Sequence, residues 1–575
     1  PRTGHSLTLE TDDFGNILKS ATVNYGRKMA DNTLPADVQQ EQAKLHITFT
    51  TNGFTNYLDQ IGAYRIPLKA ETKIYELTGM NPANGQAFQT IELLSAFSGA
   101  VEIDFEVTPN DLTPQKRLID DRQTFYLAND LATSLPFQQM DTMGLFYQSY
   151  QLAFTPSLAT FLAGNRITGA MLTAAQYVQL DGTNWWIPSG FESYLRPAET
   201  VSDALKRFYL PVIIKDASGK ETKLGYDNYS LLLVETEDAL QNMITVDTVD
   251  YRVLQPAKLK DANDNFSEVI TDELAMVIAT SVYGKESDGT HGDTPLSAYN
   301  IIVPANTQEV ISYPQKFLQQ ATTFFYYDFF AWANNSLPTS FTSVIRETHV
   351  SNLQEGQNSR VFLSVGYSNG MGQSMQVKAQ AEPGIALQWE NGAVVQVDTS
   401  PNLRWITNGR TILNNKGNPV KQYEPFFSAT FGFESEAQLV EIGFSPVFHY
   451  DALGRNIRID HASGTFSSVT FNAWQQRSWD ENDTVLQSQW YLDRGSPSPL
   501  SPEPTDPKTR AAWLAAKQAN TPFQSHFDSM GRAFYTIADN GTAGKYPSKS
   551  VLDLTGNLLV AMDARNNKVI QYQYD

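Results

Sequence analysis

A short unit that recurs along the chain constrains its fold more than any other feature. The clearest copy, Tyr450–Arg455, reads Tyr-Asp-Ala-Leu-Gly-Arg, so an aromatic residue and an Asp precede two free positions, a Gly and an Arg. Related copies occupy Thr11–Asn16, Phe527–Arg532 and Leu552–Asn557. The Asp and Gly residues that define the unit are Asp12 and Gly15, Asp451 and Gly454, Asp528 and Gly531, and Asp553 and Gly556.

The chemistry of this unit is that of a β-hairpin turn. An Asp at the first turn position accepts a hydrogen bond from the backbone two residues on, and a Gly three residues later adopts a positive φ angle without steric cost. Each copy therefore predicts strand, turn and strand, with a bulge beside the turn. A single Asp-x-x-Gly is also a common isolated turn, but its recurrence favours a structural repeat. Partial copies lie at Asp238–Asn242, Asp261–Asn265, Asn369–Gly372 and Asn414–Asn418.

Composition narrows the class of protein. A chain of 575 residues exceeds what one hydrophobic core usually serves. Aromatic residues make up 12%, which suits pleated, half-buried β-surfaces. The absence of cysteine excludes disulfides and cysteine-bound metals. A net charge of −20, with no cluster of Lys and Arg, argues against a nucleic-acid surface.

The pattern of apolar, polar and turn-forming residues divides the chain into segments. Residues 1–112 alternate strand and turn patterns, with strands predicted at His5–Thr11, Ile17–Tyr25, Leu45–Thr51, Thr72–Leu77 and Val101–Val107. Residues 191–495 return to strands with repeat-like turns, and 522–575 carry the last repeat units. The fold class expected is therefore mainly β, a long antiparallel sheet built of hairpins.

Two helical segments interrupt this β pattern. Thr113 and Pro114 suit a helix start, and helical spacing of apolar residues marks 113–190 as a helical insertion. The pieces expected there run from Thr113 to Leu131, Asp141 to Ala153, Ser157 to Leu162 and Ala170 to Val178. A Pro-rich linker and helix fill 496–521, with Asp506 as the N-cap and Pro507 at the first helical position.

An aromatic run, Phe317–Trp332, stands out within the second β segment. In a β protein such a run is typical of a strand buried on both faces. The alternative is an exposed patch for a partner or a membrane.

A search for catalytic chemistry finds no nucleophile elbow, phosphate-binding loop, dinucleotide fingerprint or HExxH motif. His449, Asp451 and His461 lie close enough in sequence to be considered for a metal, but Asp451 is already the turn residue. Asp261–Asn265 partly resembles a calcium loop but lacks the required Gly at its sixth position. Trp479–Thr484 is rich in acids and is better explained as a solvated loop. The sequence therefore predicts no enzyme, no cofactor and no metal site.

The unit Tyr-Asp-x-x-Gly-Arg resembles the YD or RHS repeat, and longer blocks are more specific. They resemble the B component of the bacterial insecticidal toxin complexes, the Tc toxins, and they follow one another in order over nearly the whole chain. These blocks are Glu71–Gly79, Tyr150–Pro156, Asn184–Gly190, Asp250–Pro256, Arg346–Ser351 and Asn414–Phe427.

The resemblance implies a fold and a role. In that family the B and C components build a hollow shell, or cocoon, from a spirally wound β-sheet, which encloses a cytotoxic effector. A propeller of the B component docks this shell on the pore-forming A component, through which the effector is translocated. This chain would supply shell wall of a secreted toxin complex, with the C component as its partner. The docking region and the self-cleavage site of the family lie outside the matching stretch, so no residue of either can be carried over.

The chain departs from the family pattern at its C-terminal end. B components end soon after the region that resembles Tyr450–Thr484, whereas this chain continues with a helix and two more repeat units. This favours a fused B–C polypeptide, or a longer relative of the family in which one chain forms the shell. Gln571–Asp575 resembles the opening of a further unit, so we expect a piece of a longer chain.

Two other functions fit a repeat-rich β protein. A carbohydrate-binding or carbohydrate-cleaving protein would use Trp185 and Trp186 to stack on sugars, although both side chains also suit packing between insertion and sheet. A cell-surface adhesion protein with YD repeats is the other alternative.

Overall fold

The computed structural model describes residues 1–83, 85–110, 112–164, 166–284, 291–443 and 445–574. The prediction of a mainly β fold is confirmed: three large sheets and one small one contain the described strands. Asp575, the last residue of the predicted further unit, lies outside the described residues.

The first sheet has eight strands, with β7 parallel to β8 at one side. Its strands are β1 (Thr3–Thr11), β2 (Ile17–Tyr25), β3 (His46–Phe54), β6 (Lys69–Thr78), β7 (Val101–Ile103), β8 (Gln115–Tyr126), β9 (Phe146–Phe154) and β10 (Trp185–Pro188). A two-stranded ribbon projects beside it, β4 (Leu58–Gln60) and β5 (Ala63–Arg65).

The second sheet has sixteen strands, in the order β11 to β22, then β25, β28, β23 and β24. They are β11 (Phe191–Ser193), β12 (Ile213–Lys215), β13 (Glu221–Tyr226), β14 (Leu233–Glu237), β15 (Met243–Asp250), β16 (Gln255–Lys260), β17 (Phe266–Thr271), β18 (Val277–Tyr283), β19 (Thr323–Asp328), β20 (Thr339–Arg346), β21 (Val361–Ser368), β22 (Ser374–Ala381), β23 (Ile385–Glu390), β24 (Ala393–Asp398), β25 (Arg404–Thr407) and β28 (Phe426–Ser428).

The third sheet has eleven strands in sequence order. They are β26 (Thr411–Leu413), β27 (Pro419–Gln422), β29 (Val447–Tyr450), β30 (Asn456–Asp460), β31 (Phe466–Phe471), β32 (Gln475–Trp479), β33 (Phe523–Phe527), β34 (Ala533–Asp539), β35 (Lys545–Leu552), β36 (Leu558–Met562) and β37 (Lys568–Gln571). The helices are α1 (Ala36–Ala43), α2 (Thr90–Gly99), α3 (Pro156–Ala163), α4 (Gly169–Ala174), α5 (Val201–Lys206), α6 (Thr307–Ser312), α7 (Pro314–Leu318), α8 (Ala331–Asn335), α9 (Ala437–Val440), α10 (Gln489–Leu492) and α11 (Pro507–Ala516).

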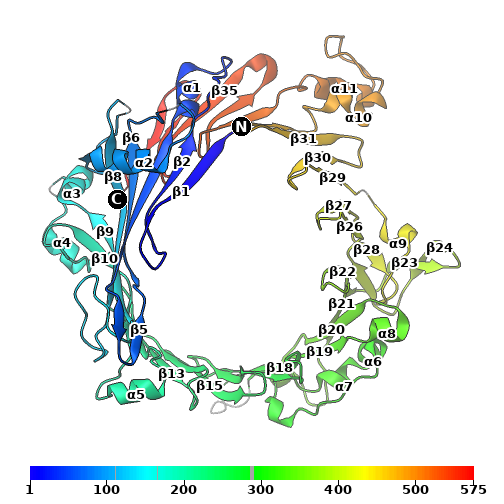
Figure 1. The fold of residues 1–575 in the computed structure, drawn as a ribbon. Helices are drawn as coiled ribbons and strands as arrows, with labels where there is room; N and C mark the ends of the chain where they lie inside the picture. Colours follow the sequence, from blue (N-terminus) through cyan, green and yellow to red (C-terminus); the bar gives the residue numbers. More distant parts are fainter. Residues whose placement is uncertain (84, 111, 165, 285–290, 444, 575) are drawn as a thin grey trace.

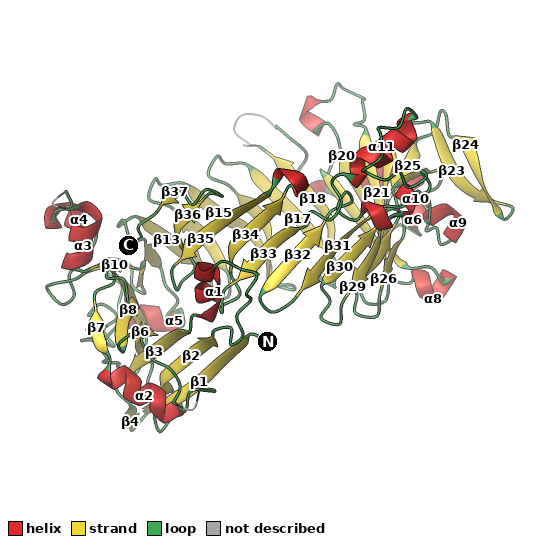
Figure 2. Ribbon diagram, turned by 90° about the horizontal axis from the view of Figure 1, so that it is seen from above, coloured by secondary structure: helices red, strands yellow, loops and turns green. Residues whose placement is uncertain are grey.

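The three sheets follow one another around a ring (Figure 1). Most strands pair with their neighbours in sequence, and right-handed strand twist curves such a sheet. Seen from above, the first strands and the last strands lie next to each other along the ring axis (Figure 2). The chain therefore winds as a spiral of about one turn, and its helices lie on the outer side of the ring (Figure 1).

The hydrophobic cores lie between the sheets and these outer helices. In the second sheet, Phe324, Val344 and Val365 are buried against Phe317 and Leu318 of α7. In the first sheet, the buried side chains Val23, Ile47 and Phe49 pack with Leu93 of α2. Because alternate residues of a strand point to opposite faces, the helices cover one face of each sheet and leave the inner face of the ring without helices.

The closing contact of the spiral joins α1 to the last strands. Val38 of α1 is fully buried in a cluster with Leu34, Phe534 and Tyr535. The Gln42 side-chain amide is also buried, and it donates to the backbone oxygens of Trp474 (3.2 Å) and Phe527 (3.0 Å). At the rim, Lys549 Nζ lies 2.6 Å from Asp37 Oδ2. Residues more than four hundred positions apart thus share one small core.

The interpretation of 113–190 as a helical insertion is wrong for its first half. Residues 115–126 and 146–154 form β8 and β9, so the first sheet runs through the predicted segment boundary at 112. β8 pairs with β6 over its length, from Thr78↔Gln115 to Glu71↔Gln123. Pairing with two neighbouring strands outweighs a local helix signal, because intrinsic propensity is weak compared with tertiary packing.

The second half of the segment does contain helices, although β10 (Trp185–Pro188) lies there as well. α3 begins after Thr155, whose hydroxyl accepts from Leu158 N–H, with Pro156 at the first position, and α4 follows. The helix predicted after Asp506 is also confirmed as α11, where the Asp506 carboxylate accepts from Thr509 N–H at 2.8 Å.

The aromatic run Phe317–Trp332 contains the predicted strand, but this strand is not buried on both faces. Only Phe324 of β19 is fully buried, since one face of the strand packs on α6 and α7 and the other faces the centre of the ring. Beyond the strand, Phe330 and Trp332 at α8 are 70% and 68% exposed.

Replacing Val38 tests the closing contact. We expect Val38→Ala to lower the free energy of local opening of α1 from the last strands by about 1–3 kcal/mol. The substitution removes fully buried methyl groups. Hydrogen exchange of the β34 amides is expected to accelerate, although β34 is remote in sequence. The control is Ile91→Ala, at a side chain 67% exposed on α2. Unchanged β34 exchange in Val38→Ala would contradict a stabilising role for the contact.

Candidate functional site

The repeat unit forms one hairpin turn with a fixed hydrogen-bond pattern. In the copy at Asp451, the N–H of Asp451 donates to Arg455 O and the N–H of Gly454 donates to Asp451 O, both at 3.0 Å. One carboxylate oxygen of Asp451 accepts from the N–H groups of Leu453 (2.9 Å) and Arg455 (3.0 Å). The Arg455 side chain also donates to Asp451, from Nε to Oδ2 at 2.8 Å. This side-chain bond, followed by the backbone bonds, holds the pKa of Asp451 below its usual range. Gly454 has a φ of 78°.

The same pattern recurs far beyond the four predicted copies. In each case the backbone N–H of the first residue donates to the backbone oxygen of the residue four positions later. The side chain of the first residue accepts from the backbone N–H of that same later residue. The first residues of these turns are Asp12, Asp216, Asp238, Asp261, Asp272, Asn369, Asn414, Asp451, Asp528, Asp553 and Asp563.

The partial copies therefore adopt the complete turn, and three turns were missed in the sequence. The fourth residue has a positive φ even where it is not Gly, as at Gln241 (67°), Asp264 (63°), Ala275 (64°) and Asn566 (62°). The turn at Asp216 could have been predicted, because Asp216 and Gly219 have the spacing of the repeat unit. At Asp272 the sequence offers only an Asp between two strand patterns.

One turn is buried and linked to its neighbour. Asp528 is 1% exposed, and its carboxylate accepts from the Met530 and Arg532 N–H groups and from Arg532 Nε at 2.7 Å. The same guanidinium donates to the backbone oxygens of Asp553 and Leu554 in the next turn. Arg532 thus fastens two successive repeat turns together.

The inner face of the second sheet carries a group of apolar side chains at β20, β21, β22 and β25, next to the hydrogen-bonded hydroxyls of Ser343 and Ser364. Five side chains on the face opposite α6 and α7 are between 41% and 56% exposed: Phe341, Ile345, Phe362, Val377 and Ile406. They meet across neighbouring strands, since Ile345 lies opposite Phe362. Phe341 lies opposite Gly366, where a Cβ atom would come within 2.1 Å of the Phe341 ring. The missing side chain lets the ring lie flat over the sheet.

The inner face of the first sheet differs in chemistry. The side chains that alternate with its buried core are short and hydroxylated. They pair in two rows across β1, β2 and β3, namely Ser6, Thr22 and Thr48, and Thr8, Ser20 and Thr50. The inner side of the ring therefore has a hydroxyl-rich sector and an apolar sector.

The residues considered for a metal do not converge. His449 Nε2 lies 2.7 Å from Asp460 Oδ2, and His461 Nε2 lies 2.7 Å from Glu481, while Asp451 is engaged in its turn. Within the described ranges, no group of three or more His, Asp or Glu side chains is arranged to hold a metal ion.

The two acidic loops are structural as well. Asp261 belongs to a hairpin turn. Asp483 accepts from the backbone and hydroxyl of Thr521, which fixes the return from α11 to β33.

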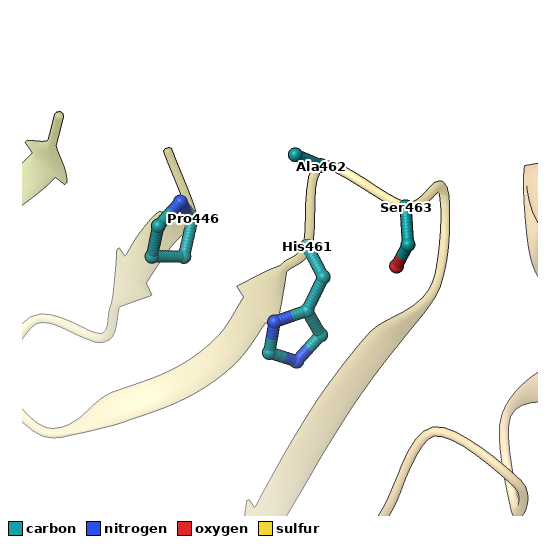
Figure 3. Close-up of a pocket in the computed structure, with 4 residues that line it drawn as sticks. All are labelled: Pro446, His461, Ala462 and Ser463. Carbon is teal, nitrogen blue, oxygen red and sulfur yellow. The ribbon is translucent and has the colours of Figure 1, made fainter. Parts of the chain in front are cut away.

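A depression of about 380 Å³ beside His461 also carries no convergent chemistry. Its lining consists of Pro446, His461, Ala462 and Ser463 (Figure 3). Among these four residues, polar side-chain atoms come from the His461 imidazole and the Ser463 hydroxyl (Figure 3), so a ligand would meet few polar atoms.

The tryptophans considered for sugar stacking are packed. Trp186 is 2% exposed, and Trp185 belongs to a cluster with Leu158 and Leu172 of the outer helices. A Cβ atom on Gly169 would touch the Trp185 ring at 3.2 Å. Trp186 therefore offers no free face for a sugar ring, and Trp185 is partly covered by the outer helices.

Most buried charges are fully paired. Lys378 is completely buried, and its ammonium group donates to Glu434 (2.6 Å) and to the backbone oxygen of Thr430 (2.8 Å). Burial nevertheless lowers the pKa of Lys378 to about 8. Asp293 accepts from the Val350 N–H at 2.9 Å and lies 2.9 Å from His349 Nδ1.

Asp121 of β8 is an exception. It is 4% exposed, and its Oδ1 has no hydrogen-bond partner within the described part of the chain. Lys73 Nζ is 3.6 Å from its Oδ2 but only 2.7 Å from Glu71. Burial therefore raises the pKa of Asp121 to about 7, against the opposing effect of Lys73.

Comparison with known proteins finds similar solved structures but no matching family model or curated protein. No protein-family model matches the chain, and no curated protein matches it. Solved structures do match, over 98% of this chain. The crystal structure of TcdB2-TccC3 has a TM-score of 0.77 at 21% identity, and that of TcdB2-TccC3-Cdc42 has 0.76 at 19%. The Photorhabdus luminescens Tc holotoxin pore, with a mutation in TccC3, has 0.76 at 20%.

The chain thus shares its fold with a segment of these Tc toxin structures. The chain covers 26% of the TcdB2-TccC3 chain and 28% of the other two, so it spans about a quarter of their length. No described helix is long and apolar enough to span a membrane.

The buried turn at Asp528 should contribute more to stability than an exposed one. We expect Asp528→Ala to lower the free energy of unfolding by about 2 kcal/mol or more, because it removes the acceptor of the Met530 and Arg532 N–H groups and of Arg532 Nε. Asp238→Ala, in a solvated turn of the same geometry, is expected to cost less. Chemical denaturation of both variants measures the difference, and equal losses would show that the Arg532 link adds nothing.

The pH dependence of stability tests Asp121. Because its pKa is raised to about 7 on folding, its contribution is present below about pH 4 and is lost as the pH rises through about 7. Asp121→Asn is expected to remove this loss and to gain, relative to wild type, on the order of 2–4 kcal/mol at pH 8. Thermal unfolding of both proteins between pH 4 and pH 8 measures it. Parallel curves would contradict the raised pKa.

Proposed function

We propose that this chain forms part of the wall of a shell that encloses an effector polypeptide before its translocation. It would do so as a segment of a Tc toxin B component or of a fused B–C chain, without catalysis of its own. The observation that carries the proposal is the apolar inner face of β20 to β25, turned toward the centre of a ring whose outer face is already covered by helices.

Apolar side chains on a concave face have a physical use. Monomeric proteins rarely expose contiguous apolar patches without a partner. An unfolded polypeptide exposes its own apolar side chains, and Phe341, Ile345 and Phe362 offer surface against which these can pack. The hydroxyl-rich inner face of β1 to β3 offers hydrogen bonds to backbone groups of the same guest.

The rest of the assembly follows from the same proposal. The C component, or the same shell fused in cis, would complete the wall and supply the enclosed effector. A pore-forming A component would dock through regions outside this chain. The complex would be secreted. A wound sheet suits this role because winding can cover edge strands whose unpaired N–H and C=O groups would otherwise favour aggregation.

Photo-crosslinking tests the proposal on the assembled complex with its partner. A photoreactive phenylalanine derivative in place of Phe362, on the inner face, is expected to label the enclosed polypeptide. The matched control replaces Phe330, which is also exposed but lies at α8 on the outer side. Labelling from position 330 as strong as that from position 362, or no labelling from 362, would overturn the inner-wall role.

Electron cryomicroscopy of the same complex provides the second measurement. We expect a closed shell with disordered density inside it. A solid or open β array would overturn encapsulation itself.

A further inference from the structure

Two histidines lie at the closing contact of the spiral, one on each side of it. His46 is the first residue of β3 and follows α1 closely in the chain. Its charged neighbours include Asp528 and Arg532, which come from the far end of the sequence. His526 belongs to β33 and precedes Phe527, whose backbone oxygen accepts a hydrogen bond from α1. The contact thus has a titratable imidazole on each of the two segments that it joins.

His526 is buried without a complete set of partners. It is 1% exposed, and its Nδ1 atom has no hydrogen-bond partner within the described part of the chain. Its Nε2 atom lies 3.4 Å from the Gln475 amide nitrogen. The centroid of its ring lies 5.7 Å from that of Tyr535, which packs with Val38 of α1 in the core of the contact. A protonated imidazole has two N–H donors, so protonation here would bury a charged donor without an acceptor.

His46 has a similar environment on the other side of the contact. Its Nε2 atom is buried and has no hydrogen-bond partner among the residues that the structure describes. Burial lowers the pKa of His46, and the cations Arg532 and Lys44 act in the same direction. Asp528 and Glu41 oppose them, but Asp528 is bonded to Arg532 and Glu41 to Lys44. The folded chain therefore favours the neutral form of His46.

The charges around His526 act in the same sense. Burial lowers the pKa of His526 to about 4. Asp31, on the loop before α1, opposes this shift, whereas Arg477 of β32 and Arg27, just after β2, support it. The Asp31 carboxylate is itself engaged, because it accepts from the Thr33 N–H at 3.2 Å and from the Thr33 hydroxyl at 2.6 Å. The closed contact therefore favours neutral imidazole at His526 as well.

The direction of the pH effect follows from these environments. A free histidine has a pKa of about 6.5. The stabilisation by neutral imidazole is therefore present above that value, and it is lost as the pH falls from about 6.5 to about 4. The carboxylates of Asp31 and Asp37 titrate at lower pH, since hydrogen bonds to Thr33 and Lys549 lower their pKa values. Mild acid thus acts on the contact through the histidines.

We propose that the closing contact is an acid-sensitive device, in which protonation of His46 and His526 releases α1 from β33 to β35. Each imidazolium would place a positive charge near Arg27, Arg477 or Arg532 and would leave an N–H donor buried without an acceptor. Release of α1 would separate the first part of the spiral from the last. The contact lies within this chain, so the proposal does not rest on the proposed shell function.

Hydrogen exchange of the α1 amides in the full chain, at pH 7.5 and at pH 5, tests the proposal. A helix of 8 residues is marginal on its own, so its release exposes its amides. After correction for the intrinsic exchange rate, we expect the protection of α1 to fall about thirtyfold from the His526 shift alone, because the opening constant rises about tenfold per pH unit below about 6.5. The β15 amides, on the opposite side of the ring, are the internal reference and should keep their protection (Figure 1).

A double variant assigns the response to the two imidazoles. The combination of His46→Gln and His526→Gln is expected to change α1 protection by less than about threefold between the same pH values, because the amide side chain does not titrate. The matched control is His449→Gln, at an exposed histidine in β29 of the same sheet, and it should respond like wild type. Circular dichroism at both pH values checks that each variant is folded.

Three outcomes would overturn the proposal. Unchanged α1 protection in the wild-type chain at pH 5 would do so without any variant. An acid response that survives in the double variant would assign the effect to other groups. An equal loss of protection in β15 would show general unfolding instead of opening at the contact.

Discussion

The fold depends on one repeated interaction, the acceptance of backbone N–H groups by the Asp or Asn side chain that opens each repeat turn. At Asp451 a single carboxylate oxygen satisfies two N–H groups that the tight turn leaves without a strand partner. The bond geometry is kept whether the fourth residue is Gly, Asn or Gln. A long sheet can therefore be extended hairpin by hairpin with few fixed residues, which explains how structures only about 20% identical share it.

The helices give this sheet its two unlike faces. They cover the outer face with compact cores, such as those beneath α2 and α7, and leave the inner face free to vary. The inner side can consequently be hydroxylated at Thr48 and apolar at Phe362 without affecting the cores behind it. The buried clusters that stabilise the fold therefore lie on the outer face.

The sequence predicted the strands well where one face is buried, as at Ile17–Tyr25, which is β2. It predicted helices well where a cap marks them, as at Asp506. The sequence-based prediction failed at 115–126. The helical spacing of a few apolar residues is a local pattern, and it carries no information on strand partners that lie about forty residues away in the chain. Turns without Gly were invisible for a similar reason. The burial of Asp121 could not be foreseen either, since β8 is flanked by β6 and β9 only in the folded protein.

The closing contact has a consequence for the order of folding. The Gln42 side chain and its acceptor on Trp474 are 432 residues apart, and closing a flexible loop of that length costs about 5 kcal/mol of chain entropy. Hairpins, in contrast, close over a few residues and form in microseconds. During synthesis the sheet can therefore assemble progressively while α1 waits for β33 to β35 to emerge. Until then the winding remains open, which leaves an interval in which another polypeptide can enter before the spiral shuts.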